Sequence, residues 1–443
     1  MIKLSESLNN LPVKLKILFI FILTISFFAV ILFFVSDEGF VFLNKQFLKG
    51  EILPERIINA TGSTLAVLQN DWKLIEKIEE AKNLLSNSPA LSFTEDKNRL
   101  IRKEIALAIL DTQTGIVLEK RYWLDQNDID KADLTRKNYL ENSENLPRFQ
   151  PKDVYEEYSV ITNWWNSFNS DWSIVKNGTV NDRYVVVADK YLISNESLAY
   201  PEDRTGKKYS DIVYVPYSKT LKDKTLITAG KKFLNDHVSD AFNEMTSFKI
   251  RSKAFPGRLV VDTITQTFVK NIFLTEQTDP KMMLLSTDGG LELAERVLIR
   301  LGANGEKAFR YTVSKTGASG LGQIMPGTYN SIQNGYPDAR LIKDVDIGRV
   351  DIKNAIKAST LVFDDHLAIV VKKTGVSKKS KLLFEEKTQD EVDEIMAAIY
   401  NGGPSKYLHL TGNISNAVKE TVFFLRKFRM LKDLGLFDQY VEI

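Results

Sequence analysis

The sequence predicts a multidomain chain with a transmembrane helix near the N-terminus, an α+β region outside the cytoplasm, and an all-α domain at the C-terminus. Three observations lead to this fold class. An uncharged apolar run covers 17–35, strand and turn patterns follow between 36 and 258, and helical periodicity with glycine-rich turns fills 259–443. At roughly 150 residues per domain, the 443 residues correspond to about three units, in agreement with this division.

The composition excludes several classes of protein. Lys and Arg number 59 and Asp and Glu 57, and the net charge of +2 argues against a strongly basic nucleic-acid-binding protein. The chain has no cysteine, which excludes disulfides, thiolate metal sites and cysteine nucleophiles. Its three histidines lie far apart, in no zinc-binding or catalytic-triad spacing: His237, His366 and His409. We therefore expect neither a metal nor a cofactor.

The apolar run at 17–35 is long enough to cross a bilayer core as a helix. Acidic residues follow it and three lysines precede it, Lys3, Lys14 and Lys16. This charge bias predicts a cytoplasmic tail at 1–16 and an exported chain from residue 36 onward. A cleaved signal peptide is the alternative, but it would have a shorter apolar core and a cleavage site between small residues, whereas this run ends in bulky side chains. We expect an uncleaved anchor.

The region 36–258, of unknown role, alternates helical and strand patterns. Residues 52–90 have a mostly helical pattern, and 123–150 are polar without a clear period, which predicts loop or short helices. An apolar run, a turn sequence and a second run predict a β-hairpin at 105–110, 111–115 and 116–118. Further strands are expected at 184–187 and 212–215, and a helix at 226–245.

Three tryptophans gather in a short stretch and allow two interpretations: Trp164, Trp165 and Trp172. They could form a platform on which sugars stack, or they could pack in the core. We favour the core, because tryptophan is usually largely buried. Separately, Asp344, Asp346 and Gly348 resemble the start of a calcium loop, but the remaining ligand spacing is absent, so no metal is expected there.

A glycine-rich stretch at 314–329 is the most informative part of the chain. Its three glycines, Gly317, Gly320 and Gly322, disfavour a helix interior and suit a turn in which the backbone approaches a ligand closely. Gln323 adds an amide that can both donate and accept hydrogen bonds. We expect at least one of these glycines at positive φ or against the ligand. Taken alone, the stretch would be an ordinary helix-joining turn.

A second stretch, 395–404, combines an amphipathic helix with a sharp stop. Its apolar residues share one helical face, and Gly402, Gly403 and Pro404 end the helix. Tyr400 and Asn401 are thereby left near its C-terminal end.

Together the two stretches resemble the lytic transglycosylases with a goose-lysozyme-like catalytic fold. The first matches the family pattern S-x-x-G-A-x-G-L-x-Q-x-M-P-x-T at Ser314, Gly317, Ala318, Gly320, Leu321, Gln323, Met325, Pro326 and Thr328. The second matches A-x-Y-N-x-G-P at Tyr400, Asn401, Gly403 and Pro404. Glu420 and Thr421 resemble a late Glu-Thr pair, and 354–358 a middle helix. The resemblance covers roughly 260–430 and implies that 259–443 is a lysozyme-like domain.

The resemblance implies cleavage of the β-1,4 bond between N-acetylmuramic acid and N-acetylglucosamine in peptidoglycan, leaving 1,6-anhydromuramyl ends. One glutamate acts as acid and then as base, unlike the two carboxylates of most glycosidases, and it needs a largely apolar site to hold its proton. The residues that it assigns to substrate binding are Ser314, Gly317, Ala318, Gly320, Gln323, Met325, Tyr400 and Asn401. The expected partners are glycan strands and the bacterial cytoplasmic membrane, spanned once with the catalytic domain on the periplasmic or cell-wall side, and no nucleic acid.

Two glutamates compete for the catalytic role. In the family's simplest pattern the acid closes an apolar helix shortly before the Ser-x-x-Gly-Ala loop. Glu306 has nearly this spacing, but the residues before it, 302–305, end a helix. Glu276 continues the i, i+3, i+4, i+7 pattern of an apolar helix face, where the chemistry needs a half-buried acid. We favour Glu276, with an inserted segment at 281–313 containing one helix, and keep Glu306 as the alternative.

Two other functions stay open. A goose-type lysozyme-like hydrolase would share the fold and the acid and differ only in the fate of the intermediate. A non-catalytic cell-wall-binding or sensory membrane protein would bind glycan without cutting it, and the unusual position of the glutamate and the large region before 259 favour it.

Overall fold

The computed structural model describes residues 72–142, 149–153, 158–198, 200–201, 206–279, 282–283, 286–373, 387–409 and 417–438. All of them belong to one compact unit, Thr64–Ile443. The predicted cytoplasmic tail at 1–16 and the predicted membrane segment at 17–35 lie outside the described residues.

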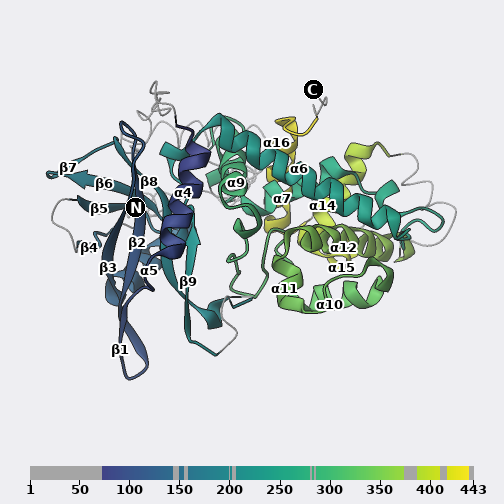
Figure 1. Ribbon diagram of the computed structural model, residues 1–443. Coiled ribbons are helices and arrows are strands. Elements are labelled where there is room, and N and C mark those ends of the chain that lie inside the picture. The colour runs from purple at the N-terminus through teal and green to yellow at the C-terminus, as the bar shows by residue number, and fades with distance from the viewer. Residues whose placement is uncertain are drawn as a thin grey trace, which may run out of the picture. The chain divides into compact units, whose positions relative to one another are not determined.

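The described residues in the first half of this unit form strands, two α-helices and short 3-10 turns (Figure 1). They are α4 (Leu74–Asn87), β1 (Phe93–Asp96), β2 (Arg99–Asp111), β3 (Val117–Asp125), α5 (Gln126–Asn142), β4 (Lys152–Asp153), β5 (Tyr158–Trp164), η1 (Ser167–Asn169), β6 (Asp171–Lys176), β7 (Thr179–Val180), β8 (Tyr184–Ser194), η2 (Asn195–Ser197), β9 (Tyr209–Tyr214) and η3 (Lys219–Leu221).

The larger sheet, here called the main sheet, has the order β4-β3-β2-β8-β9, with β1 added on β2. Strands β2 and β3 form the predicted hairpin, in which Leu110 pairs with Val117 across the turn. The turn is held by Asp111, whose carboxylate accepts the backbone N–H of Gln113 at 3.0 Å. Helix α4 packs its apolar stripe on one face of the main sheet, against the alanines and valines of β2 and β8.

The smaller sheet, β5-β6-β7, covers the opposite face of the main sheet and closes an aromatic core. Trp165 and Trp172 are buried there, with ring centroids 6.4 Å apart in an edge-to-face arrangement. Trp164 is half-buried, and the centroid of its ring lies 5.2 Å from that of the Tyr139 ring. The prediction that these tryptophans pack in the core is therefore confirmed for Trp165 and Trp172.

Helix α5 differs from the prediction for 123–150, which expected loop or short helices. It is a single helix from 126 to 142 that buries little more than Ile129 and Ala132. The indole N–H of Trp165 donates to the Asp133 carboxylate of this helix at 2.6 Å. A helix fixed by so few contacts leaves almost no hydrophobic period in the sequence, and for that reason its pattern did not reveal it.

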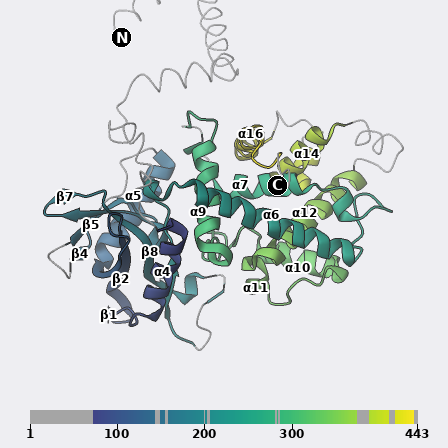
Figure 2. The same ribbon diagram turned by 45° about the horizontal axis from the view of Figure 1, so that its top comes forward.

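The second half of the unit is helical. Its elements are α6 (Lys224–Ser247), η4 (Val260–Asp262), α7 (Gln266–Gln277), α9 (Leu291–Asn304), η5 (Gly305–Lys307), α10 (Pro326–Gly335), η6 (Pro337–Ala339), α11 (Val345–Val350), α12 (Ile352–Lys373), α14 (Gln389–Gly402), α15 (Pro404–His409) and α16 (Lys419–Asp433). Helices α6 and α9 agree closely with the predicted helices at 226–245 and within 281–313. Buried side chains of α7, α12, α14 and α16 share one core, and Figure 2 shows these helices grouped together.

Helices α6 and α9 touch through two glycines. A Cβ added at Gly230 would lie 1.8 Å from the Leu298 carbonyl oxygen, and one at Gly302 would lie 2.3 Å from the Leu226 carbonyl oxygen. Both obstacles are backbone atoms, so a methyl group at either position must separate the helices.

We expect Gly230→Ala to destabilise the fold by at least about 2 kcal/mol, because it overpacks a contact between two backbones. The matched control is Gly327→Ala in α10, where an added Cβ meets no atom within 4 Å. That change should be neutral or stabilising by up to about 1 kcal/mol. Urea unfolding of both variants checks the prediction, and equal stabilities would refute the close contact.

The fold-class prediction is wrong. The described residues form an α+β structure with two antiparallel sheets rather than separate α+β and all-α parts. The sheet joins the helices directly: the Asn304 side chain at the end of α9 accepts from the Val215 N–H at 2.8 Å and donates to the Val215 carbonyl at 3.0 Å. The Tyr214 hydroxyl likewise donates to the Ala308 carbonyl at 2.6 Å. Periodicity identifies a helix but not the segment it packs on, so sequence patterns did not reveal this union.

The transmembrane part of that prediction concerns 17–35, which lies outside the described residues. Within the described ranges, no helix combines the length and the apolar character that crossing a membrane requires.

Candidate functional site

Glu276 occupies the last turn of α7, on the face that the sequence predicts. Val269, Ile272 and Phe273 on this face are fully buried. The helix begins at a Thr265 cap, whose hydroxyl accepts the N–H of Phe268 at 3.1 Å, and ends one residue after Glu276. The side chain of Glu276 is itself half-buried, so it lies at the edge of the core rather than within it.

The surroundings of Glu276 favour a protonated carboxyl. Burial raises its pKa to about 7, the nearby Lys427 ammonium lowers it, and the Glu420 carboxylate raises it. Lys427 is itself buried and donates to the Thr278 carbonyl at 2.8 Å. Among the described residues, no hydrogen bond or ion pair reaches the Glu276 carboxyl, which leaves its O–H available to a ligand at neutral pH.

The residue after Glu276 connects α7 to the glycine-rich loop at 314–325. The Gln277 amide donates to the carbonyls of Gly320 at 3.2 Å and Leu321 at 2.8 Å. Gln277 could not be identified from the sequence, because no pattern shows that an amide will reach carbonyls more than forty residues away. This contact brings the loop next to the end of α7.

The glycines of the loop meet the predicted requirement. Gly317 and Gly320 have φ values of +88° and +74°. A Cβ on Gly320 would lie 2.0 Å from the Arg349 carbonyl oxygen, and one on Gly322 would lie 2.3 Å from the Ser359 hydroxyl oxygen. The prediction of at least one glycine at positive φ is confirmed.

Arg349 of α11 anchors the loop through hydrogen bonds to its backbone carbonyls. Its buried guanidinium donates to the carbonyls of Gly317 at 2.7 Å and Ile324 at 3.3 Å, and it pairs with Asp346 at 2.8 Å. No sequence pattern identifies this residue, because its acceptors are backbone carbonyls of a distant loop. Arg349 fixes both ends of the loop at once.

The side chains of Ser314 and Gln323 form hydrogen bonds within the loop itself. The Ala318 N–H donates to the Ser314 hydroxyl at 3.0 Å, which closes the turn at its start. Gln323 has a positive φ of 47°, and its amide donates to the Gly320 carbonyl at 2.9 Å. The Met325 side chain is exposed, at the entry to α10. The structure thus places these predicted binding residues on one loop, and Ser314 and Gln323 shape its turn.

Helix α14 brings Tyr400 to the same place. The Tyr400 hydroxyl donates to the Gly322 carbonyl at 2.5 Å, and the centre of the Tyr400 ring lies 4.7 Å from that of the Phe363 ring. Burial and then the charge of Glu276 raise the pKa of Tyr400, so this hydroxyl stays neutral and lies within electrostatic reach of Glu276. Asn401 accepts from the Thr421 hydroxyl at 3.0 Å. Three predicted parts, the end of α7, the glycine-rich loop and the end of α14, therefore converge.

Glu306, the alternative acid, has a different environment. It lies on η5 with an exposed side chain, and its carboxylate is 2.7 Å from the imidazole Nε2 of His237. No apolar helix face holds it. Of the two glutamates, Glu276 has the surroundings that a general acid requires.

The aspartates that resemble the start of a calcium loop have other roles in the structure. Asp344 caps α11 by accepting two backbone N–H groups, and Asp346 pairs with Arg349. In the part of the chain that the structure describes, no group of three His, Asp or Glu side chains could hold a metal ion.

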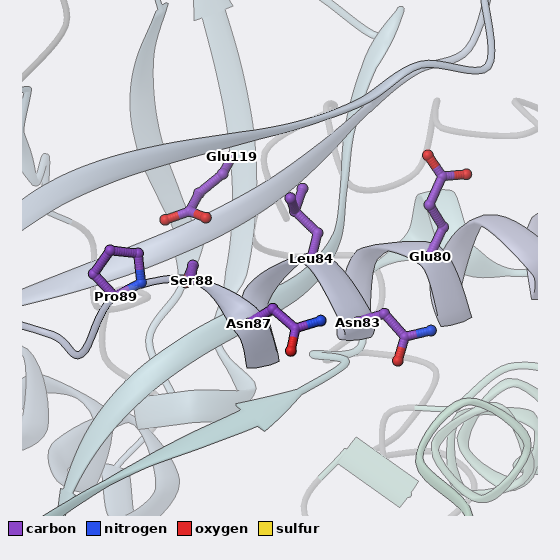
Figure 3. A pocket seen from close by; sticks show the side chains of 7 residues that line it. All are labelled: Glu80, Asn83, Leu84, Asn87, Ser88, Pro89 and Glu119. Atoms are coloured by element: carbon purple, nitrogen blue, oxygen red, sulfur yellow. The ribbon is translucent and has the colours of Figure 1, made fainter.

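A surface pocket lies on α4, in the sheet-bearing half of the unit. Figure 3 shows its lining: four side chains of α4, the two residues after the helix, and one glutamate of β3, namely Glu80, Asn83, Leu84, Asn87, Ser88, Pro89 and Glu119. Both carboxylates are paired with cations, Glu80 with Lys77 and Glu119 with Arg121, each at 2.7 Å. The pocket therefore offers no unpaired acid.

The pKa of Glu276 has a measurable consequence for stability. The folded chain binds this proton more tightly than an ordinary glutamate with a pKa of 4.5 does. The stability that the neutral carboxyl provides is complete below pH 4.5 and is lost as the pH rises through about 7. Glu276→Gln cannot ionise, so it should be more stable than the wild type by up to about 3 kcal/mol near pH 8 and equally stable near pH 4. Urea unfolding at both pH values checks this, and an equal difference at both would contradict the raised pKa.

Comparison of the chain with protein-family models, with curated proteins and with solved structures finds no match. Any inference about function therefore rests on the residues of the site.

Proposed function

We propose that this protein is a peptidoglycan lytic transglycosylase that uses Glu276 as its single acid and base. The observation that carries the proposal is the position of a half-buried glutamate at the end of α7, whose pKa burial raises to about 7, beside the glycine-rich loop and Tyr400. The resemblance of 314–328 and 400–404 to transglycosylase motifs supports it independently. We expect the reaction outside the cytoplasm, where peptidoglycan lies.

In the proposed reaction Glu276 first gives up a proton and then takes one back. Glu276 donates its proton to the glycosidic oxygen as the bond from C1 of N-acetylmuramic acid breaks. The resulting carboxylate then accepts the proton of the C6 hydroxyl of the same sugar, whose oxygen forms the new bond to C1. The product is a 1,6-anhydromuramyl end, Glu276 is protonated again, and no water is consumed.

The environment of Glu276 suits both steps. An acid with a pKa of about 7 is protonated in a large fraction of molecules at neutral pH and is a strong enough base afterwards. The buried Lys427 ammonium of α16, which donates to the Thr278 carbonyl just after α7, stabilises the carboxylate that forms in the first step. Gln277 and Arg349 hold the loop carbonyls in place, so the loop needs little reorganisation when a glycan binds.

Digestion of purified peptidoglycan by the full chain tests the proposal. Mass spectrometry of the released muropeptides should show anhydromuramyl ends. Reducing muramyl ends would instead identify a goose-type lysozyme-like hydrolase. Glycan binding without any released muropeptide would identify a non-catalytic wall-binding or sensory protein, and either result would refute the transglycosylase.

A further inference from the structure

Two neighbouring phenylalanines of α16 have opposite surroundings. Phe424 is buried and belongs to the core of the helical half, whereas 38% of the Phe423 side chain is exposed. Of the phenylalanines that the structure describes, only Phe423 and Phe93 are exposed. The ring of Phe93 has an aromatic neighbour, because its centroid lies 5.1 Å from that of Tyr209. Phe424 anchors this part of α16 in the core, so core packing does not explain the aromatic ring at Phe423.

Phe423 lies on the side of α16 that faces Glu276. It follows Glu420 by three residues and precedes Lys427 by four, and residues at these spacings share one face of a helix. The Lys427 ammonium donates to the Thr278 carbonyl, two residues after Glu276, at 2.8 Å. The charges of Lys427 and Glu420 both act on the Glu276 carboxyl, the first lowering its pKa and the second raising it. The exposed ring of Phe423 therefore borders the Glu276 site.

Contacts on both sides of Phe423 fix the helix that carries it. Before it, the Thr421 hydroxyl donates to the side chain of Asn401, at the end of α14, at 3.0 Å. After it, Arg429 pairs with Glu394 of α14 at 2.6 Å. A binding residue on a helix held in this way is in position before its ligand arrives.

An exposed aromatic ring beside the proposed acid suits a sugar ligand. The pyranoses of a β-1,4-linked glycan carry their substituents equatorially, so each sugar has an apolar face of C–H groups. The face of an aromatic ring is negative and attracts these positively polarised groups, and the contact removes apolar area of both partners from water. Trp165 and Trp172 cannot stack on a sugar in this way because they are buried. Phe423 has the exposure that this contact requires.

We propose that Phe423 is a sugar-stacking residue of the Glu276 site and binds a pyranose of the glycan strand next to the bond that is cleaved. The inference rests on the proposed function, from which it takes the substrate, and adds a residue that the matched motifs do not contain. Phe423 has no group that transfers a proton, so it contributes to substrate binding and not to the chemical step.

Val422 offers a matched control for Phe423. It is the preceding residue of α16, its side chain is equally exposed, at 38%, and it points about 100° away around the helix axis. A loss of binding caused only by removing exposed apolar surface from α16 would appear in both variants, whereas a loss caused by stacking would appear at Phe423 alone.

Calorimetric titration of the full chain with soluble glycan strands freed of their peptides tests the proposal. It is done in the Glu276→Gln background so that the strands stay intact. Phe423→Ala should weaken binding at least about fivefold, because part of the burial of an apolar ring is lost. Phe423→Trp keeps an aromatic face and should bind at least as tightly as the parent. Val422→Ala should leave binding unchanged.

Kinetics and stability of the chain with Glu276 intact complete the test. Phe423→Ala should raise KM for muropeptide release about as much as it weakens binding and leave kcat nearly unchanged. Its unfolding midpoint in urea should equal that of Val422→Ala, because both side chains are exposed.

The stacking role fails if Phe423→Ala binds glycan as well as Val422→Ala does, or if Phe423→Trp binds as weakly as Phe423→Ala. It also fails if the strands do not bind to Glu276→Gln at all. A chain that releases no muropeptide but loses glycan binding in Phe423→Ala would refute the transglycosylase and support the stacking role. Muropeptide release with an unchanged KM in Phe423→Ala would refute the stacking role and leave the transglycosylase standing.

Discussion

Glu276→Gln should lower muropeptide release at least about 10²–10⁴-fold, the range that general acid catalysis typically contributes. Glutamine keeps the size of the side chain and its ability to hydrogen-bond, but it has no proton to give to the glycosidic oxygen. Because the glutamate carboxyl has no hydrogen-bond partner among the described residues, the change breaks no contact. The variant should therefore fold normally, and near pH 8 it should be more stable than the wild type.

Glu306→Gln is the matched control for this result. Its carboxylate is exposed and, among the described residues, pairs only with His237, so activity should stay near that of the wild type. Initial rates of muropeptide release from purified peptidoglycan compare the two variants. A large loss in Glu306→Gln with an active Glu276→Gln would reverse the assignment of the acid, and two active variants would exclude a single-glutamate mechanism at either position.

Gly320→Ala should be the most damaging small change in the loop. The residue has a φ of +74°, which costs a residue with a side chain about 1–2 kcal/mol. Its Cβ would also lie 2.0 Å from the Arg349 carbonyl oxygen, and overpacking of this kind adds about 1–3 kcal/mol. We expect a total loss of about 2–5 kcal/mol in the free energy of unfolding, together with a marked loss of activity, because the displaced loop carries the carbonyls that Gln277 holds.

Gly317→Ala separates the cost of the positive φ from the cost of the steric overlap. It has a similar φ of +88°, but an added Cβ meets no atom within 4 Å. Only the backbone strain of about 1–2 kcal/mol should remain. Urea unfolding of both variants measures the difference, and equal losses would show that α11 does not press on the loop at Gly320.

Features fixed by short-range patterns were predictable from the sequence. The hairpin at 105–118 follows from two apolar runs around a turn, and its register agrees with them. The Val269, Ile272 and Phe273 face of α7 placed Glu276 correctly at the edge of the core. The positive φ of Gly317 and Gly320 follows from the absence of a side chain at positions where the chain turns sharply.

Features that depend on distant partners were not predictable. Asn304 completes the hydrogen bonds of Val215 across almost ninety residues, and this joins the sheet to the helices that were expected to form a separate domain. Gln277, Arg349 and Lys427 act on backbone carbonyls, which no sequence pattern identifies as their acceptors.

The pH dependence of muropeptide release tests the central claim, that a protonated Glu276 cleaves peptidoglycan, most directly. The acid must carry its proton to act, so kcat/KM should be constant below its pKa and fall about tenfold per pH unit above about 7. Glu276→Gln should show no such decline because it has no titrating acid. Release that stays constant from pH 5 to pH 9, or no release at any pH, would contradict the account.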